Sequence, residues 1–196
     1  MAPYDMKREL KHLYAPKNTA WALVDVPAQQ FIAVDGAGNP NSAPEYVRAV
    51  ESLYAVAYAL KFASKRAGQD FVVGPLEGLW WSADMSAFTT RAKDTWEWRM
   101  MIAQPPWVTP AMVAEAIEAK GPTAPVRLES LDEGRCAQVL HIGSYDAETA
   151  IMMALHNEYL PAAGLSPRDL HHEVYLSDPR RTGAEKLRTV IRQPVR

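Results

Sequence analysis

The hydrophobic pattern of this chain predicts the element order strand, helix, strand, strand twice in succession. The first copy begins near residue 31 and the second near residue 137, and the copies share a pattern rather than residues. Units of this kind pair their sheets about a pseudo-two-fold axis. We therefore predict an α+β fold with an antiparallel-rich sheet, helices on one face and a ligand cleft on the other. We expect a single domain over residues 1–196, with pseudo-repeats at about 20–104 and 125–196.

The individual elements follow from periodicity and from residues that start or stop helices. A Ser-Ala-Pro-Glu sequence at 42–45 has the pattern of a capping box with proline in the first turn. We expect helices over 5–14, from 43 to about 68, over 109–120 and from about 146 to 164, and strands over 31–34, 71–82, 95–102, 126–131, 136–142, 171–176 and 186–192.

Charge and cysteine content argue against several classes of function. A formal net charge of −2 gives no field that attracts polyanions, so we expect no direct nucleic-acid partner. Cys136 is the single cysteine, which rules out an intramolecular disulfide and favours a reducing cytoplasm. The N-terminus lacks the apolar stretch of a signal peptide, and no apolar run approaches the roughly 20 residues that span a bilayer. We therefore expect a cytoplasmic protein without a membrane partner. The sequence leaves open whether it is a monomer or a dimer.

The aromatic residues are mostly of the types that carry a polar atom. Six Trp and eight Tyr outnumber four Phe. Trp and Tyr combine a large apolar body with a hydrogen-bonding group, so they suit a half-wet cavity better than a dry core. The expected partner is therefore a small hydrophobic or aromatic ligand, and an ordinary core with an aromatic rim is the alternative.

One strand near the C-terminus is the most informative motif. Side chains alternate between the two faces of a strand, so His171, Glu173 and Tyr175 share the face assigned to the cleft. His172 and Val174 are then expected to face the helices. A carboxylate between aromatic groups is partly desolvated and more basic, and it can bind a cationic ligand or activate a water as general base. The alternative is a solvated glutamate on an exposed sheet face.

Two adjacent tryptophans occupy the corresponding strand of the first copy. One of Trp80 and Trp81 must face the helices and the other the cleft, and we favour Trp80 for the cleft. Glu77 falls near the pseudo-symmetric place of Glu173, although Pro75 blurs the register. A ligand-facing Glu77 and an ordinary loop carboxylate are both open.

Other candidate ligand contacts lie between the two copies and at the start of the last long helix. Trp96 and Trp98 share a face and are together core or cleft residues, with the charged opposite face favouring the core. We keep Trp98 and Met101 as candidate ligand contacts. Trp107 lies in an extended loop suited to a lid. Tyr145 precedes a helix, where it reaches over the mouth of the sheet or forms a hydrophobic staple.

Motifs for other chemistries are missing from the sequence. His171 and Glu173 share a face, but no HExxH or paired CxxC motif completes a zinc site. No G-x-S-x-G elbow surrounds Ser82 or Ser144. The Gly-Ala-Gly sequence at 36–38 lacks the third glycine of a dinucleotide loop. We predict no metal and no cofactor.

The C-terminal sequence HHEVYLSDPRR at 171–181, followed by EKLRTVIRQPV at 185–195, closely resembles the end of stand-alone GyrI-like proteins. Similar blocks occur at 11–17, 34–41, 75–80 and 98–105, so the resemblance covers nearly the whole chain. It implies a duplicated fold shared with the effector-binding domains of multidrug-responsive regulators, in which a ligand lies beside a buried glutamate. The motif places that glutamate at Glu173. The chain lacks the helix-turn-helix domain of those regulators, which puts a direct role in transcription in doubt.

The resemblance also implies two alternative functions. Stand-alone members are associated with hydrolysis of cyclopropane-bearing DNA-alkylating natural products. In such a reaction Glu173 would act on water, while Tyr175 or His171 would stabilise a developing phenolate. The flat electrophile would be held by aromatic side chains, namely Trp80, Trp107 and Tyr145. The other function is non-catalytic: sequestering flat, often cationic drugs, or inhibiting a protein target such as gyrase. We favour the hydrolase.

Overall fold

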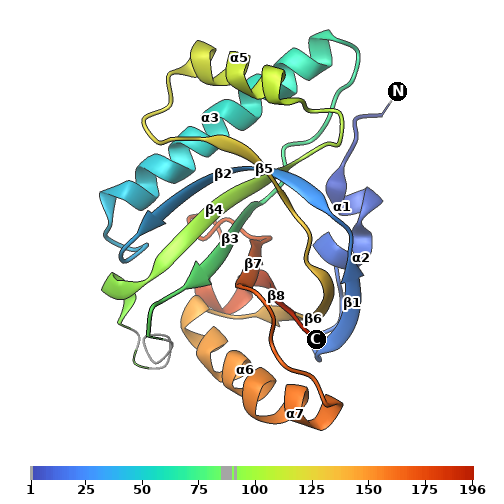
Figure 1. The fold of residues 1–196 in the computed structure, drawn as a ribbon, viewed down its shortest axis with the longest axis vertical. Helices are drawn as coiled ribbons and strands as arrows, with labels where there is room; N and C mark the ends of the chain where they lie inside the picture. Colours follow the sequence, from blue (N-terminus) through green and yellow to red (C-terminus); the bar gives the residue numbers. More distant parts are fainter. Residues whose placement is uncertain (1, 85–89, 91) are drawn as a thin grey trace.

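The described residues are 2–84, 90 and 92–196, in a computed structural model (Figure 1). The strands are β1 (Ala22–Val26), β2 (Gln29–Ala37), β3 (Leu76–Trp81), β4 (Glu97–Gln104), β5 (Arg127–Leu131), β6 (Gly134–Ile142), β7 (His171–Tyr175) and β8 (Arg188–Pro194). The α-helices are α1 (Met6–Glu9), α2 (Lys11–Tyr14), α3 (Pro44–Arg66), α5 (Pro110–Lys120), α6 (Glu148–Ala154) and α7 (Leu160–Ala163). Short 3-10 turns lie at η1 (Lys93–Thr95), η2 (Tyr145–Ala147) and η4 (Ala184–Lys186), and a π-helical turn, η3 (Leu155–Tyr159), joins α6 to α7.

The strands form one sheet in which every neighbouring pair is antiparallel. Their order is β1-β6-β8-β7-β3-β4-β2-β5. The predicted copies are β2-α3-β3-β4 and β6-α6-β7-β8, and their strands β3 and β7 pair at the centre, where Gly78 lies opposite Glu173. The α+β fold with a duplicated element order is therefore confirmed.

Two local features differ from the prediction. The strand β1 was not expected. Its five residues pair with the distant β6, a contact that the local sequence does not reveal. The capping box at 42–45 is wrong, since Ala43 is the N-cap of α3 and no side chain caps it. The backbone amide of Ser42 instead donates to the carbonyl of Asn39 at 3.0 Å. The prediction for α5 is correct, because the Thr109 hydroxyl accepts from the amide of Met112 at 3.3 Å.

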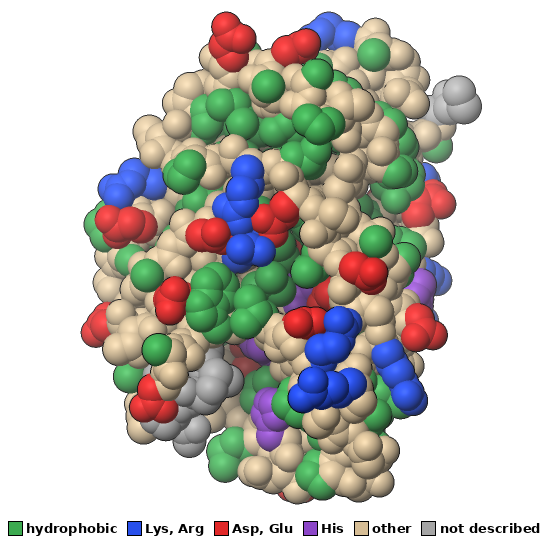
Figure 2. All heavy atoms as spheres, viewed as in Figure 1, with side chains coloured by type: hydrophobic (Ala, Val, Ile, Leu, Met, Phe, Trp, Pro, Cys, Tyr) green, Lys and Arg blue, Asp and Glu red, His purple; other side chains and the backbone are tan. Residues whose placement is uncertain are grey.

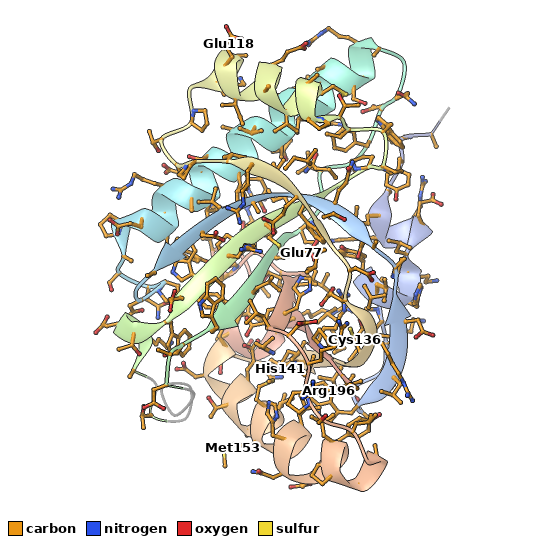
Figure 3. The ribbon with its side chains drawn as sticks, viewed as in Figure 1. Glu77, Glu118, Cys136, His141, Met153 and Arg196 are labelled. Atoms are coloured by element: carbon orange, nitrogen blue, oxygen red, sulfur yellow. The ribbon has the colours of Figure 1, made fainter. Side chains whose placement is uncertain are left out.

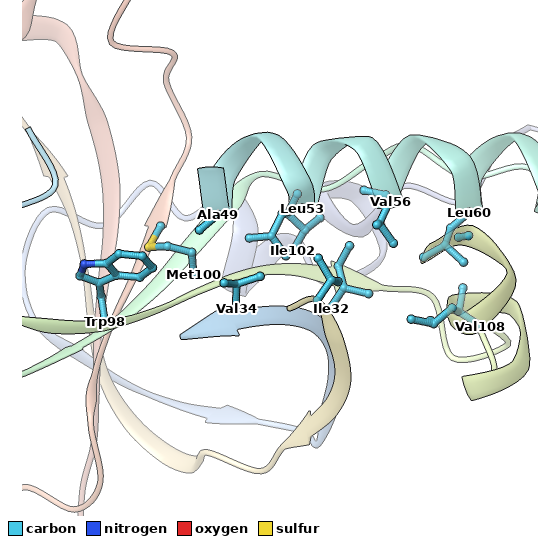
Figure 4. Close-up of a cluster of buried hydrophobic side chains, with 14 of the residues drawn as sticks. Ile32, Val34, Ala49, Leu53, Val56, Leu60, Trp98, Met100, Ile102 and Val108 are labelled. Atoms are coloured by element: carbon cyan, nitrogen blue, oxygen red, sulfur yellow. The ribbon is translucent and has the colours of Figure 1, made fainter. Parts of the chain in front are cut away.

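A large apolar core lies between the sheet and α3 with α5. Alternate residues of β2 and β4 face α3, which contributes a stripe of apolar residues at helical spacing (Figure 4). The buried members of this contact include Ile32, Val34, Met100 and Ile102 from the sheet and Leu53, Val56 and Leu60 from α3. The 23-residue α3 is therefore held along most of its length, which gives the sheet a rigid cover on this side.

The opposite face of the sheet is concave and is closed by the short helices α1 and α2 (Figure 1). Leu13 and Tyr14 from α2 are fully buried there against residues of both copies. His172 and Val174 point into this second core and are also fully buried. The expectation that these two side chains meet the helices of the repeats is wrong, because the N-terminal segment fills their face of the sheet.

The molecular surface mixes charges of both signs. Figure 2 shows acidic and basic side chains interleaved over the face that it presents. One such group spans three strands, where Arg99 and Arg127 each contact both Asp35 and Glu129 within 3.0 Å. Within the described residues, no helix is long and apolar enough to cross a membrane.

Candidate functional site

A cavity of about 1620 Å³ opens between α3 and α6, above the central strands β3 and β7. Its lining includes Tyr46 and Tyr54 from α3, Glu148, Met152 and His156 from the α6 segment, Trp80 from β3, and His171, Glu173 and Tyr175 from β7. The cleft was expected on the helix-free face, but it lies on the helix-bearing face. The reason is that the two repeat helices cover the outer parts of the sheet and leave its centre open, while α1 and α2 fill the other face.

Glu173 lies on the floor of this cavity and is held by its neighbours on β7. His171 Nε2 lies 2.9 Å from Glu173 Oε1, and the Tyr175 hydroxyl donates to Glu173 Oε2 at 2.7 Å. These three side chains meet because residues two apart on a strand project to the same face. The Glu173 side chain is 14% exposed, so it is sheltered but open to the cavity. The predicted grouping of the three residues is thus present in the structure.

The Tyr175 hydroxyl is fully committed to neighbours within the protein. It donates its one proton to Glu173 and accepts a hydrogen bond from Trp80 Nε1 at 2.8 Å. Burial, and then the charge of Glu173, raise the pKa of Tyr175 well above its usual value. The hydroxyl therefore orients Glu173 and has no proton left to donate to a ligand.

Trp80 reaches Tyr175 by lying across a glycine of its own strand. A Cβ placed on Gly78 would lie 2.9 Å from Trp80 Nε1 and 3.2 Å from Met100 Sδ. Gly78 is also the cross-strand partner of Glu173. The absence of a side chain at Gly78 therefore leaves room for the Trp80 ring beside the Tyr175 hydroxyl.

Aromatic rings form the walls of the cavity around this floor. Tyr46 and Trp80 are stacked with centroids 6.4 Å apart, and Trp96 meets Trp80 edge-on at 5.6 Å. On the second copy, Tyr145 meets Tyr175 edge-on at 5.7 Å. Parallel and edge-on ring faces of this kind accommodate a flat apolar molecule by stacking.

A second carboxyl group, Glu148, lines the same cavity from the first residue of α6. It is only 7% exposed, and its Oε1 atom has no hydrogen-bond partner among the described residues. Burial, and then the charge of Glu173, raise the pKa of Glu148 to about 10, although a hydrogen bond with Thr189 and the charge of Lys93 act in the opposite direction. This direction favours a neutral, protonated carboxyl group at Glu148, which lines the same cavity as Glu173.

Histidines at the cavity do not assemble a metal site. His156 lies near His171, and burial followed by the influence of His171 lowers the pKa of His156. In the part of the chain that the structure describes, no group of three or more histidine, cysteine, aspartate or glutamate side chains has a geometry that could hold a metal ion.

Two predicted ligand contacts lie on the opposite face of the sheet from the cavity. Glu77 and Met101 are cross-strand partners, and both are fully buried in the core beneath α1 and α2 (Figure 3). Glu77 was a candidate because it falls near the pseudo-symmetric place of Glu173, in a register that Pro75 blurs, and Met101 was a further candidate ligand contact. Their side chains project to the face opposite Trp80, so neither lines the cavity.

Glu77 belongs instead to a buried network of charged and polar groups. The Tyr14 hydroxyl donates to Glu77 Oε1 at 3.0 Å, and His172 Nε2 lies 3.0 Å from Glu77 Oε2. Glu133 contacts both His172 Nδ1 and Arg192 Nη1 at 3.0 Å. Burial alone would raise the pKa of Glu133, but His172 and Arg192 lower it to about 2. The network ties the N-terminal segment to the strands that carry the site.

Two predicted tryptophans are also outside the cavity. Trp98 is fully buried in the α3 core, where a Cβ on Gly36 would lie 2.1 Å from its ring. Trp107 packs edge-on against Tyr4 and donates from Nε1 to Ser64 Oγ at 2.9 Å, so it does not form a lid. Sequence alternation alone did not separate Trp98 from the cleft, because only the position of α3 decides which part of that face is covered.

Several cavity residues were missed by the sequence analysis. Tyr46 lies in the first turn of α3, and Glu148 is the first residue of α6, the corresponding helix of the second copy. The two residues occupy equivalent positions at the start of the repeat helices. The duplicated element order could therefore have indicated them as cavity residues. Trp96, just before β4, was grouped with Trp98, but it lines the cavity.

Comparisons with known proteins agree with this geometry. A profile of the GyrI-like small molecule binding domain matches residues 21–196. An uncharacterized conserved protein from Listeria innocua is 36% identical, with 98% of this chain and 100% of that chain covered and a TM-score of 0.89. A hydrolase from Listeria innocua has the same identity and coverage, with a TM-score of 0.84. The EcmrR C-terminal domain shares the fold at 12% identity, covering 90% of this chain and 97% of that domain with a TM-score of 0.62. No curated protein matches the chain.

Proposed function

Since the chain belongs to the GyrI-like small-molecule-binding family, we propose that it is a hydrolase that adds water to strained, flat electrophiles, with Glu173 as general base. The observation that carries this proposal is the Glu173 carboxylate, oriented by His171 and Tyr175 on the floor of an aromatic-walled cavity. Relatives from Listeria innocua at 36% identity are described as hydrolases, which supports the reaction class.

The carboxylate of Glu173 retains acceptor capacity for a water molecule. A carboxylate offers about four lone-pair sites, and its neighbours His171 and Tyr175 occupy one on each oxygen. A water bound at a remaining site is positioned beside any molecule stacked in the cavity. Positioning of this kind lowers the barrier by avoiding the entropy cost of bringing reactants together.

The proposed substrate is a cyclopropane joined to a cyclohexadienone ring, as in cyclopropanoid DNA-alkylating natural products. Water oxygen bonds to a cyclopropane carbon, the strained carbon–carbon bond breaks, and its electron pair moves into the ring. The former carbonyl oxygen becomes a phenolate, which a proton then converts to the phenol. Glu173 takes the proton that the attacking water loses. General-base assistance of this kind contributes roughly 10²–10⁴-fold to the rate.

Replacing Glu173 with Gln tests the reaction, because the amide keeps the shape but cannot take a proton. The parent spirocyclopropyl-cyclohexadienone is incubated with each protein, and the phenolic alcohol is counted by mass spectrometry. We expect many turnovers per wild-type molecule and a loss of at least about 100-fold in kcat for Glu173→Gln. Binding of the phenolic product, followed by tryptophan fluorescence, should be retained. Equal turnover by the two proteins would remove Glu173 from the mechanism.

A non-catalytic binder is the second candidate, and the size of the cavity favours it. Its volume of about 1620 Å³ exceeds the 300–1,000 Å³ typical of small-ligand sites, which suits a protein that sequesters varied drugs. In that case the wild-type protein would protect at most one molecule of the electrophile per chain, and no product would accumulate. The same mass-spectrometric count therefore separates the two functions.

A further inference from the structure

We propose that Glu148 is the general acid of this site and donates its proton to the substrate oxygen that gains negative charge as Glu173 deprotonates water. This inference rests on the proposed hydrolase function and extends it. It assigns the two carboxyl groups of one cavity to opposite roles, one as base and one as acid.

The position of Glu148 supports this role independently of its acidity. The residue is 7% exposed, lines the cavity and enters it from α6, whereas Glu173 enters from β7. Its Oε1 atom is buried without a hydrogen-bond partner among the described residues. A hydrogen bond with Thr189 on β8 favours the charged form of Glu148, but burial favours the neutral, protonated form more strongly.

The charged groups around Glu148 act in the same direction on balance. Burial is the main cause of the raised pKa of Glu148, and the charge of Glu173 on β7 is the second. A hydrogen bond with Thr189 on β8 and the charge of Lys93 on η1 oppose them. Tyr145 on η2 and Tyr175 on β7 both have raised pKa values, so neither becomes a competing anion. Two titratable groups whose environments separate their proton affinities are the usual arrangement for an acid and a base in one site.

Tyr175, which the sequence suggested together with His171 as a candidate donor, cannot take this part. Its only proton is donated to Glu173. Burial raises the pKa of Tyr145 to about 12, which makes it a weaker acid than Glu148 at about 10. The proposed product is a phenol, whose pKa is also about 10. Of these cavity groups, Glu148 is therefore the one that can protonate the forming phenolate.

The complete step balances. Water bonds to carbon and gives one proton to Glu173, while the cyclopropane bond breaks and the former carbonyl oxygen receives the proton of Glu148. The product contains the elements of one water molecule more than the substrate. Glu173 then carries the extra proton, and transfer of that proton to Glu148 restores the starting state of the site.

The test measures kcat for the parent spirocyclopropyl-cyclohexadienone between about pH 6 and pH 11, corrected for the uncatalysed reaction. Wild-type protein is compared with Glu148→Gln, which keeps the shape without an ionisable proton, and with Glu148→Asp, which keeps the acid. Glu118→Gln, on the outer side of α5, is the matched control (Figure 3). Infrared spectroscopy at neutral pH records the band of protonated carboxyl groups in the same proteins.

We expect kcat to fall by about 10²–10⁴-fold in Glu148→Gln and to be unchanged in Glu118→Gln. Wild-type kcat should decline at alkaline pH as Glu148 loses its proton, and Glu148→Asp should keep such a decline at a lower rate. The protonated-carboxyl band should disappear in Glu148→Gln.

A Glu148→Gln variant that stays within about threefold of wild-type kcat, or that keeps the alkaline decline, overturns the acid role while wild-type turnover still supports the hydrolase. A wild-type protein without turnover instead overturns the hydrolase itself. The alkaline decline and the carboxyl band are expected to be lost in Glu148→Gln. Their loss in Glu148→Asp as well would contradict the assignment, because aspartate keeps an ionisable proton.

Discussion

The indole nitrogen of Trp80 lies 2.8 Å from the hydroxyl oxygen of Tyr175, and this contact joins the aromatic wall of the cavity to its acidic floor. The same hydroxyl donates to Glu173 at 2.7 Å, so one chain of hydrogen bonds runs from β3 of the first copy to the carboxylate on β7 of the second. The wall residue Trp80 is therefore connected to Glu173 through the Tyr175 hydroxyl.

Replacing Trp80 with Phe should test this connection, because it keeps a ring in the wall but removes the donor to Tyr175. We expect kcat to fall about twofold to tenfold, the value of one neutral hydrogen bond, with little change in affinity for a flat phenol. Trp107→Phe is the control, since Trp107 donates to Ser64 away from the cavity. It should lower the free energy of unfolding by about 1 kcal/mol without altering kcat. Equal effects of both substitutions on kcat would argue against the connection.

Gly78→Ala should displace the Trp80 ring, because the new Cβ would lie 2.9 Å from Trp80 Nε1. Overpacking of this kind costs about 1–3 kcal/mol, and we expect it to appear both in the free energy of unfolding and in weaker binding of the phenolic product. Gly74→Ala provides the comparison, since the nearest atom to its Cβ would be 3.7 Å away. Urea denaturation and fluorescence titration measure the two quantities. Unchanged binding in Gly78→Ala would show that the ring does not need this glycine.

Glu148→Gln should stabilise the protein, and the gain should grow with pH. The pKa of Glu148 is raised from 4.5 to about 10 in the folded state, so between these values the unfolded chain releases a proton that the folded chain keeps. Wild-type stability therefore falls as pH rises through this window, whereas glutamine has no proton to lose. We expect a gain of at least about 1 kcal/mol at about pH 8 by urea denaturation. A gain that shrinks as pH rises would contradict the assignment of a neutral Glu148.

Glu133→Gln should destabilise the fold strongly, because it leaves His172 and Arg192 buried without their shared carboxylate. We expect a loss of about 3–5 kcal/mol, against less than about 1 kcal/mol for Glu129→Gln in the partly exposed network on β5. The pKa of Glu133 is lowered from 4.5 to about 2, so its contribution is complete above 4.5 and is lost as pH falls through about 2. The difference between wild type and Glu133→Gln should therefore narrow on acidification, and a constant difference would contradict this origin.

The grouping of His171, Glu173 and Tyr175 was predictable from the sequence because it depends on local geometry alone. Strand side chains alternate with a period of two, so three residues at odd positions share a face in any sheet that contains them. The repeated order of strands and helices was predictable for the same reason, since hydrophobic period reports secondary structure directly.

The misassigned residues depend on contacts between distant segments. Glu77 and Met101 were placed in the cleft, but pairing of β3 with β4 turns both toward the core that α1 and α2 close. Trp96 and Trp98 were expected on the same sheet face, yet α3 covers Trp98, whereas Trp96 lines the cavity. Nothing local in the sequence states which part of a sheet face a helix will cover.

The sequence by itself determined the duplicated α+β order, the common face of His171, Glu173 and Tyr175, and the family that these residues suggest. Only the tertiary structure decided that the cleft opens between α3 and α6, and that Glu148 lies beside Glu173 in it. The physical reason is the distance along the chain over which each interaction acts. Periodicity and turn chemistry act between residues a few positions apart, whereas burial and the proton affinity of a carboxyl group depend on what the folded chain brings against it.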